Sequence, residues 1–269
     1  MIANRDQPDP ADGRISTELR DGLFLIGIDR PAKLNGFTPV MLRGMAQAYT
    51  RYEREPGARC AVVFAEGANF TAGLDLPKVA PHLGGNTLLV EDDEIDPFGS
   101  RAPWRSKPVV FAVQGICFTL GIEMMLAADL VVAASNTRFA QVEVKRGLLP
   151  TGGATIRMVE RAGWGNAMRY LLTGDEFDAQ TAQRLGFIQE IVEPGRQKER
   201  AMELAQVICA QAPLAVKATI ENARTALREG PAAATALFGP VQTRLLASED
   251  FQEGLRSFKD KRVPEFRGK

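Results

Sequence analysis

The chain has 269 residues, which is enough for one large domain or two modest ones. Hydrophobic residues make up 45% and charged residues 25%, and Lys+Arg and Asp+Glu both number 33, so the formal net charge is zero. This balance argues against nucleic acid or an anionic membrane as the main partner. The 3 cysteines are far apart, which argues against a disulfide framework or a cysteine zinc site. With no signal-type N-terminus and no apolar run of ~18 residues, we expect a cytoplasmic protein.

Short apolar strand patterns alternate with helical patterns through most of the chain. A hairpin is predicted at Asp21-Gly22, and Thr38 is suited to cap a helix that runs to about Arg54. Further strands are expected at 60–65, 109–113, 130–134 and 187–192, and further helices at 121–128, 152–162, 166–172 and from 196 onward. This order predicts an α/β core with an α-helical appendage.

The predicted organisation divides near residue 195. Residues 1–195 form the α/β core, with residues 1–13 expected to be disordered because they are polar and rich in Pro and Asp. Residues 196–269 form a helical region that either contacts other subunits or only covers the core. The proline-rich segment 77–107 is the least regular part, and a loop of this length is usually functional or mobile. Its acidic run 91–94 is expected either to form a lid or to stay disordered.

One carboxylate stands out because its surroundings are apolar. Glu123 lies in the first turn of a helix whose other residues are nearly all small or apolar, directly after a buried strand and a tight turn. A charge in such a place needs a partner, a hydrogen bond or a chemical role. Glu143 follows one strand later, and two carboxylates in unlike environments suit general acid–base chemistry. The structural alternatives are a buried salt bridge for Glu123 and a solvated loop acid for Glu143.

Two turns rich in glycine and small residues follow the strands 60–65 and 109–113. They are Ala72-Gly73-Leu74-Asp75 and Thr119-Leu120-Gly121. Peptide N–H groups released at neighbouring strand ends can converge on one oxygen and stabilise an oxyanion there. Either turn alone is equally well explained as an ordinary glycine turn. The single histidine, His82, and the absence of a G-x-S-x-G sequence argue against a Ser-His-Asp triad.

Ordered sequence blocks from about Ile15 to the C-terminus resemble the crotonase (enoyl-CoA hydratase/isomerase) superfamily. The blocks are Arg30-Pro31 with Asn35-Gly36, Phe70-Thr71-Ala72-Gly73-Leu74-Asp75-Leu76, Lys107-Pro108-Val109-Val110, Gln114-Gly115, Gly121-Ile122-Glu123, Ala127-Ala128-Asp129, Phe139-Ala140-Gln141-Val142-Glu143, Gly147-Leu148-Leu149-Pro150, Gly152-Gly153-Ala154 and Leu172-Thr173-Gly174. The resemblance implies a crotonase-like spiral of ββα repeats with a C-terminal α-helical region. It also implies a homotrimer or a homohexamer built as a dimer of trimers.

The resemblance further implies an acyl-CoA thioester as the substrate, so that coenzyme A is part of the substrate and no metal or redox cofactor is required. The two oxyanion donors fall at the N–H groups of Leu74 and Leu120, and Leu120 replaces the family's usual glycine, which keeps the N–H and narrows the acyl pocket. The positions implied to meet the CoA moiety are Lys33, Leu34, Ala72, Asp75, Leu76 and Lys261.

Relatives of the hydratase type carry glutamates at both acid positions, as this chain does at Glu123 and Glu143. The resemblance therefore implies reversible addition of water to a 2-enoyl-CoA, giving a 3-hydroxyacyl-CoA. Two alternatives stay open. In the first, the chain is a double-bond isomerase that uses one acid of the pair. In the second, it is a non-catalytic relative that only binds acyl-CoA.

Overall fold

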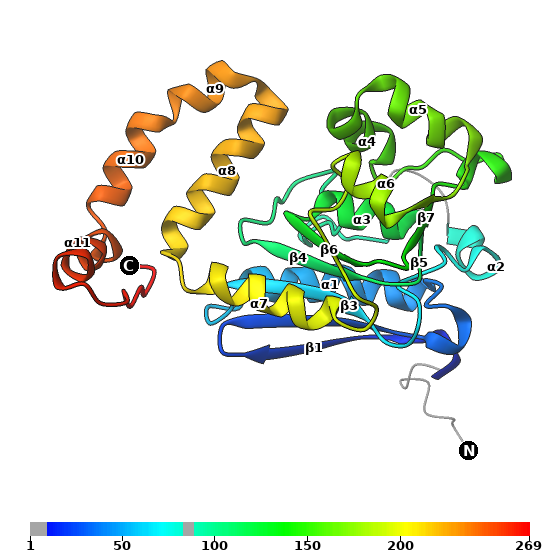
Figure 1. The fold of residues 1–269 in the computed structure, drawn as a ribbon, viewed down its shortest axis with the longest axis horizontal. Coiled ribbons are helices and arrows are strands. Elements are labelled where there is room, and N and C mark those ends of the chain that lie inside the picture. The colour runs from blue at the N-terminus through cyan, green and yellow to red at the C-terminus, as the bar shows by residue number, and fades with distance from the viewer. Residues whose placement is uncertain (1–9, 83–88) are drawn as a thin grey trace.

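In the computed structural model, which describes residues 10–82 and 89–269, the main sheet has six strands (Figure 1). Their order is β1 (Arg14–Arg20), β2 (Leu23–Asp29), β3 (Cys60–Ala65), β4 (Val109–Val113), β6 (Leu130–Ala134) and β9 (Glu190–Val192). Only β1 and β2 pair antiparallel, and the other neighbours are parallel. Every residue of β3 and β4 is buried, as expected for central strands of a parallel sheet covered on both faces.

The β1–β2 hairpin forms where the sequence predicts it. Asp21 and Gly22 have φ values of 49° and 82°, and two consecutive left-handed residues make the two-residue turn that matches the twist of the strands. A second sheet of three strands, shorter than the first, runs beside it. It contains β5 (Ile116–Phe118), β7 (Arg138–Ala140) and β8 (Phe177–Asp178).

The chain passes repeatedly from the main sheet to the small sheet and then into a helix. β4 leads into β5 and α3 (Leu120–Ala127), and β6 leads into β7, the 3-10 helix η4 (Glu143–Arg146) and α4 (Ala154–Ala162). The preceding turn follows the same path, because Thr71 forms a parallel bridge with Cys117 of β5 before α2 (Leu76–Val79) begins. This is the spiral of strand, strand and helix that the resemblance implies.

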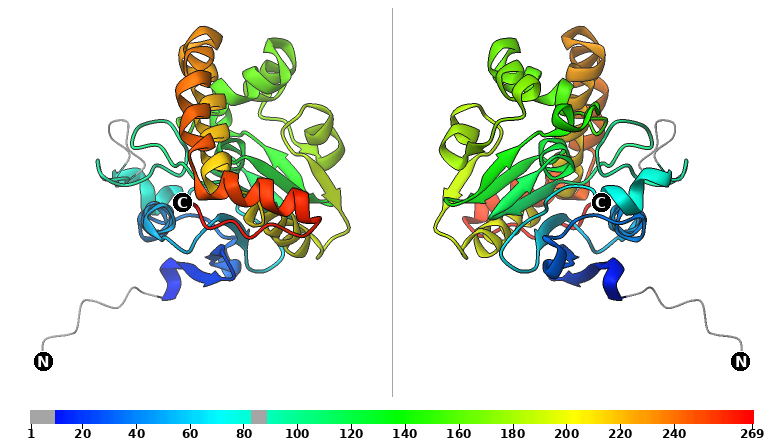
Figure 2. Two further views of the ribbon diagram at one scale, coloured as in Figure 1. Left: turned by 90° about the vertical axis from the view of Figure 1, so that its left-hand side faces the viewer. Right: turned by 90° about the vertical axis from the view of Figure 1, so that its right-hand side faces the viewer.

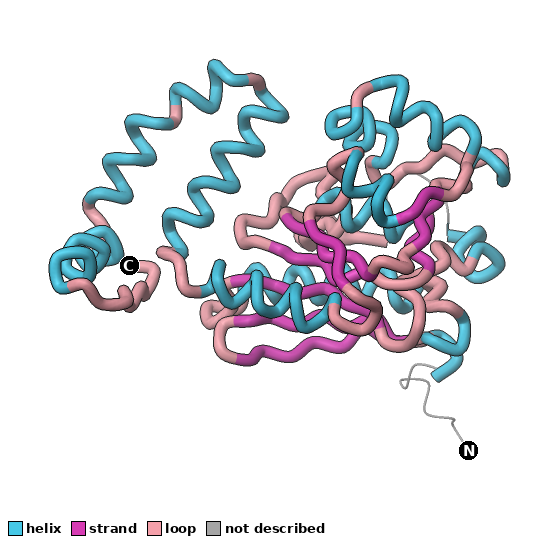
Figure 3. Tube along the Cα trace, viewed as in Figure 1, coloured by secondary structure: helices cyan, strands magenta, loops and turns pink. Residues whose placement is uncertain are grey.

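Helices cover both faces of the main sheet (Figure 3). On one face α1 (Pro39–Arg54) begins as predicted, with the Thr38 hydroxyl accepting a hydrogen bond from the Met41 N–H, and it buries Tyr49 and Tyr52 in the larger core. On the other face α7 (Gln197–Cys209) buries Ala201, Ala205 and Cys209 against the sheet in a smaller core. The remaining helices of the core are α5 (Trp164–Thr173) and α6 (Ala179–Arg184).

The C-terminal helices form an arm that extends beyond the sheets (Figures 1 and 2). The arm consists of α8 (Pro213–Glu229), α9 (Pro231–Ala236), α10 (Phe238–Leu246) and α11 (Glu249–Asp260). α9 begins at Pro231 and α11 begins at the Ser248 cap, whereas the break between α9 and α10 lies at Leu237. Because α7 packs on the sheet, the part that leaves the core starts at α8 rather than at residue 196. In the described part of the chain no helix is both long and apolar enough to cross a membrane.

Three local predictions need correction. The predicted disordered segment 1–13 is too long. Residues 1–9 lie outside the described residues, but residues 10–12 form a 3-10 helix, fastened where the Arg30 Nε donates to the Ala11 carbonyl (2.8 Å) and the Thr38 hydroxyl donates to the Asp12 carbonyl (2.7 Å). Residues 116–118, where the sequence predicts no strand, are strand β5. The strand predicted at 187–192 covers only residues 190–192, because Phe187 and Ile188 pack in the core before the ladder begins.

The acidic run 91–94 is ordered in this structure by contacts with arginines, and Arg54 donates to the Asp93 carboxylate (3.3 Å). Arg101 donates through Nη2 to the Glu91 carbonyl (2.8 Å) and through Nη1 to the Asp92 carboxylate (3.1 Å). Gly84 and Gly85 of the same irregular segment lie outside the described residues. The three cysteines are buried, Cys117 in the larger core and Cys60 and Cys209 in the smaller one.

Candidate active site

The two predicted glycine turns lie side by side. The Thr71 N–H donates to the Ile116 carbonyl (2.9 Å), and the Phe118 N–H donates back to the Thr71 carbonyl (3.0 Å). Gly73 has a φ of +106°, and a Cβ atom at this position would collide with the Thr119 hydroxyl. A glycine is therefore required both by the backbone conformation and by the closeness of the second turn.

The N–H groups of Leu74 and Leu120 are both left without an acceptor in the described part of the chain. Around Leu74, the Gly73 carbonyl and the Asp75 N–H bond to the backbone of Phe37 at 2.8 Å each, so the Leu74 N–H faces away from that pairing. Leu120 is the first residue of α3, where the N–H precedes the intrahelical ladder. These are the two donors that the resemblance implies.

Thr119, directly before Leu120, has a strained backbone. Its φ of 48° and ψ of −115° are rare for a β-branched residue. Its N–H donates to the Ala140 carbonyl of β7 (2.9 Å), which helps to hold this conformation. Such strain persists only where the surroundings impose it, and it occurs preferentially at functional sites. Here it turns the chain sharply between β5 and α3 and so positions the Leu120 N–H.

Glu123 lies in α3 and is only 3% exposed. Its Oε1 accepts a hydrogen bond from the Ala154 N–H at 3.2 Å, and a Cβ atom on Gly152 would lie 2.7 Å from its Oε2. Burial raises the pKa of Glu123 to about 7; the Ala154 N–H opposes this rise, and the neighbouring charge of Glu143 adds to it. No cation pairs with this carboxylate in the described residues, so the salt-bridge interpretation does not apply.

Glu143 begins the 3-10 helix η4, after β7 has returned the chain to the small sheet. Burial raises the pKa of this carboxyl to about 7 as well, although the Gln141 amide donates to its Oε1 at 3.0 Å and opposes the rise. Within the described residues, Glu143 Oε2 and Gln141 Oε1 are the two buried side-chain atoms without a hydrogen-bond partner. Buried polar atoms are nearly always paired, so these two indicate a place for water or a ligand.

Arg157 is a residue that sequence reasoning missed. It lies on α4 and donates to the Gly99 carbonyl (2.8 Å) and the Gly152 carbonyl (3.1 Å). It thereby ties the irregular segment 77–107 to the turn against which Glu123 rests, and its positive charge lowers the pKa of Glu123 to a small extent. An arginine on an amphipathic helix carries no sequence signal for this contact, because its acceptors are backbone carbonyls.

Five of the six positions expected to meet the CoA moiety lie together beside the Leu74 turn. The Ala72 N–H donates to the Leu34 carbonyl (3.0 Å), Lys33 is exposed next to Leu34, and Leu76 begins α2 directly after Asp75. Lys261 does not join them within one chain. It ends α11, which lies at the opposite end of the molecule from α2 (Figure 1).

The carboxylate of Asp75 already has a protein partner. Arg30, whose side chain is almost fully buried, donates through Nη1 to Asp75 Oδ2 (2.8 Å) and to the Gly36 carbonyl (2.9 Å). Asn35 accepts from the Arg30 N–H (2.7 Å) and donates to the carbonyls of Glu66 and Asn69. The sequence marked Arg30 and Asn35 as motif residues, and the structure shows that they fix the loops around Leu74.

Comparison with known proteins agrees with the family resemblance of the sequence. A family model described as enoyl-CoA hydratase/isomerase matches residues 18–269. The enoyl-CoA hydratase EchA19 of Mycobacterium tuberculosis is 30% identical, over 94% of this chain and 96% of that protein. The 1,2-epoxyphenylacetyl-CoA isomerase of Escherichia coli is 29% identical, over 95% and 98%. A crystal structure of a probable enoyl-CoA hydratase/isomerase from Mycobacterium abscessus has a TM-score of 0.91 and 45% identity, with 95% and 98% covered.

Proposed function

The chain belongs to the enoyl-CoA hydratase/isomerase family and has its crotonase fold, and on that premise we propose that it adds water reversibly to a 2-enoyl-CoA, giving a 3-hydroxyacyl-CoA. One observation carries the proposal. Two glutamates without cationic partners, each with a pKa raised to about 7, lie in the same region as two N–H groups that have no acceptor in the described residues. A carboxyl pair close to half-protonation at neutral pH can supply one acid and one base.

The two N–H groups are proposed to bind the thioester carbonyl oxygen. Negative charge grows on this oxygen when water adds to the conjugated double bond, because the intermediate is enolate-like. Two fixed donors stabilise that charge without reorganising, and one such donor is typically worth about 3 kcal/mol of barrier. The buried Leu120 side chain, 2% exposed, then forms part of the wall of the acyl pocket.

The two carboxyl groups are proposed to hold the reacting water between them. Glu123 assists the attack of the water oxygen on the β-carbon, and Glu143 delivers a proton to the α-carbon, where the new C–H bond forms. The unpartnered Glu143 Oε2 supports this arrangement, since it is buried and free to bond a water. Because the charge of each acid affects the other, the proton uptake belongs to the pair rather than to one residue.

The cluster of Lys33, Leu34, Ala72, Asp75 and Leu76 is proposed to meet the CoA moiety, with Asp75 acting through its bond to Arg30 rather than by direct contact. Lys261 reaches such a site only from another copy of the chain, which agrees with the predicted trimer or hexamer. The exposed apolar side chains of the arm support self-association. They include Leu227 at 72%, Leu255 at 53% and Phe258 at 87% exposure.

The test is replacement of Glu143. We expect Glu143→Gln to lower the hydration rate of a 2-enoyl-CoA at least ~100-fold, because a general acid is lost. Glu193→Gln, which changes an exposed acid just after β9, serves as the matched control and should leave the rate unchanged. Near-normal hydration by Glu143→Gln would overturn the proposal.

A 3-enoyl-CoA substrate distinguishes the isomerase alternative from the hydratase proposal. An isomerase would convert this substrate in wild-type form and after Glu143→Gln, and lose the activity only with Glu123→Gln. The binding-only alternative requires that CoA thioesters of all chain lengths from C4 to C16 bind without turnover.

A further inference from the structure

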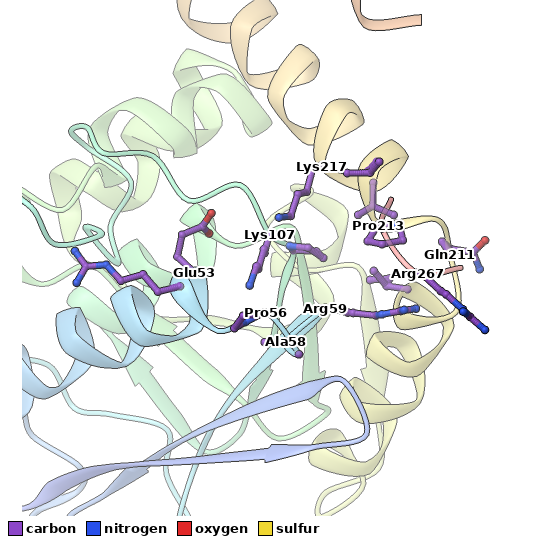
Figure 4. Close-up of a pocket in the computed structure, with 16 residues that line it drawn as sticks. Glu53, Pro56, Ala58, Arg59, Lys107, Gln211, Pro213, Lys217 and Arg267 are labelled. Atoms are coloured by element: carbon purple, nitrogen blue, oxygen red, sulfur yellow. The ribbon is translucent and has the colours of Figure 1, made fainter. Parts of the chain in front are cut away.

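A cavity lies where the parallel strands β3 and β4 begin, whereas the acid pair lies beyond the other end of these strands. It has a volume of about 390 Å³ and is bounded by the end of α1, the residues that precede β3 and β4, the start of α8 and the C-terminal tail (Figure 4). Arg59 and Lys107 stand just before parallel strands whose far ends lead to the Leu74 and Leu120 turns. The cavity and the proposed active site are therefore separated by the length of those strands.

The charged side chains around this cavity are mostly cationic. Arg54, Arg59, Lys107, Lys217 and Arg267 line it, against a single carboxylate, that of Glu53. The chain as a whole has no net charge, so this local excess is not a reflection of composition. Figure 4 shows Lys107 and Lys217 directed into the space between the end of α1 and the start of α8.

Several of these groups already have partners. Arg59 donates to the carbonyls of Cys209 (2.9 Å) and Phe266 (2.5 Å), which attaches the C-terminal tail to the core. Glu53 accepts from the backbone N–H of Ser106 (3.0 Å) and from the Ser106 hydroxyl. The Glu53 carboxylate is thus hydrogen-bonded to Ser106, and it forms no ion pair with Lys107 or Lys217 in the described residues.

Lys107 is 4% exposed and caps the end of α1. Its Nζ donates to the carbonyls of Tyr52 (3.0 Å) and Glu55 (2.6 Å), which leaves one of its three N–H bonds without an acceptor in the described residues. Burial lowers the pKa of Lys107, and the charge of Lys217 lowers it further, while Glu53 and Glu55 oppose the change. Lys107 forms no ion pair with a carboxylate in the described residues, so its buried ammonium group has no direct counter-ion.

Lys217 is half-buried, and its ammonium group bonds to no acceptor in the described residues. It lies in the first turns of α8, a helix of 17 residues that begins at Pro213 without a side-chain cap. The N–H of Leu214, which also lines the cavity, precedes the intrahelical ladder, so the positive end of the helix dipole faces the same space. Two ammonium groups and a helix N-terminus converge there.

We propose that this cavity binds the phosphate group of a small phosphorylated ligand, held by Lys217, the third N–H of Lys107 and the first turn of α8. A phosphate offers three or four acceptor oxygens to these donors, which a monocarboxylate does not. The cavity lies within the size range of small-molecule sites, and Pro56, Pro108 and Pro213 give it apolar walls for a short organic group.

Isothermal titration calorimetry on the whole chain, without coenzyme A because its own phosphate groups would compete for the cavity, tests the site through the effect of replacing Lys217. We expect inorganic phosphate and glycerol phosphate to bind, and Lys217→Ala to weaken both at least tenfold. Arg43→Ala removes the same charge from the exposed face of α1 and should change neither affinity. Lys217→Arg should retain most of the binding, which separates loss of charge from misfolding.

Binding that Lys217→Ala leaves unchanged, or no binding by the wild-type chain at millimolar anion, would overturn the proposal. Tighter binding of glycerol phosphate than of inorganic phosphate identifies an organic phosphate as the ligand, and the reverse order identifies free phosphate. None of these measurements requires turnover, so failure of the hydratase proposal would leave their outcome unaffected.

Discussion

The two ends of the parallel strands differ in how a nearby carboxylate is paired. At the edge where the strands begin, Asp129 accepts hydrogen bonds from Arg105 (2.7 Å), Arg224 (3.0 Å) and the Val109 N–H (2.7 Å). Burial alone would raise the pKa of Asp129, but the Arg105 guanidinium outweighs it and the pKa is lowered. At the edge where the strands end, Glu123 has no cation and its pKa rises to about 7.

The comparison separates a structural charge from a reactive one. Asp129 is half-buried and Glu123 is buried, and burial raises the pKa of both carboxyl groups, so burial does not explain why their pKa values shift in opposite directions. The partner does, because an arginine keeps a carboxylate ionised whereas its absence allows the proton to return near neutral pH. The following predictions test this difference, beginning with the largest expected effect.

Asp129→Asn should destabilise the fold by about 4 kcal/mol, because it leaves the nearly buried Arg105 without its counter-charge. Urea unfolding at pH 7 measures this. The loss should shrink as pH falls below about 4, since a lowered pKa contributes stability above the ordinary pKa of Asp and loses it in acid. Asp93→Asn breaks an exposed ion pair with Arg54 and should cost under ~0.5 kcal/mol. Equal losses in the two variants would contradict the comparison.

Gly73→Ala should lower kcat about 100-fold, because the added methyl group displaces the Thr119 turn and with it the proposed oxyanion donor, the Leu120 N–H. Steady-state kinetics with a 2-enoyl-CoA measure this. Gly195→Ala is a control of similar backbone strain, since Gly195 has a φ of +92° but no neighbouring atoms within 4 Å. It should lower stability and leave kcat intact. A similar loss of activity in both variants would mean that strain alone is responsible.

Glu123→Gln should stabilise the protein at high pH, by about 3 kcal/mol at pH 8 relative to its effect at pH 4. A raised pKa means that the folded state favours the protonated acid, so the wild-type chain loses stability as pH rises from about 4.5 to above 7. Glutamine does not ionise and avoids this loss. Thermal unfolding at both pH values measures the difference, with the exposed Glu229→Gln as a control that shows no such trend. A pH-independent difference would argue against a buried, unpaired Glu123.

Much of the fold was accessible from sequence because its signals are local. The strands predicted at 60–65, 109–113 and 130–134 match β3, β4 and β6, since each is an uninterrupted apolar run. β5 was missed because Ile116–Phe118 lies between glycines that suggest a turn, and its partner β7 is distant in the sequence.

The candidate site was only partly accessible. Glu123 could be singled out because a charge in an apolar helix is unusual. Gln141, which donates to Glu143, and Arg157, which holds the Gly152 turn, could not be assigned a role, because their contacts depend on how loops meet in space. The basic cavity was also invisible, since its cations come from five separate segments of the chain.

The burial of all three thiols offers a way to watch the protein open. Cys117 reports on the larger core, and Cys60 and Cys209 report on the smaller core beneath α7. Burial raises the pKa of each thiol, so an alkylating reagent that needs the thiolate finds no target in the closed molecule. Labelling therefore proceeds only during transient openings, and the order in which these cysteines are modified reveals which face of the sheet separates first.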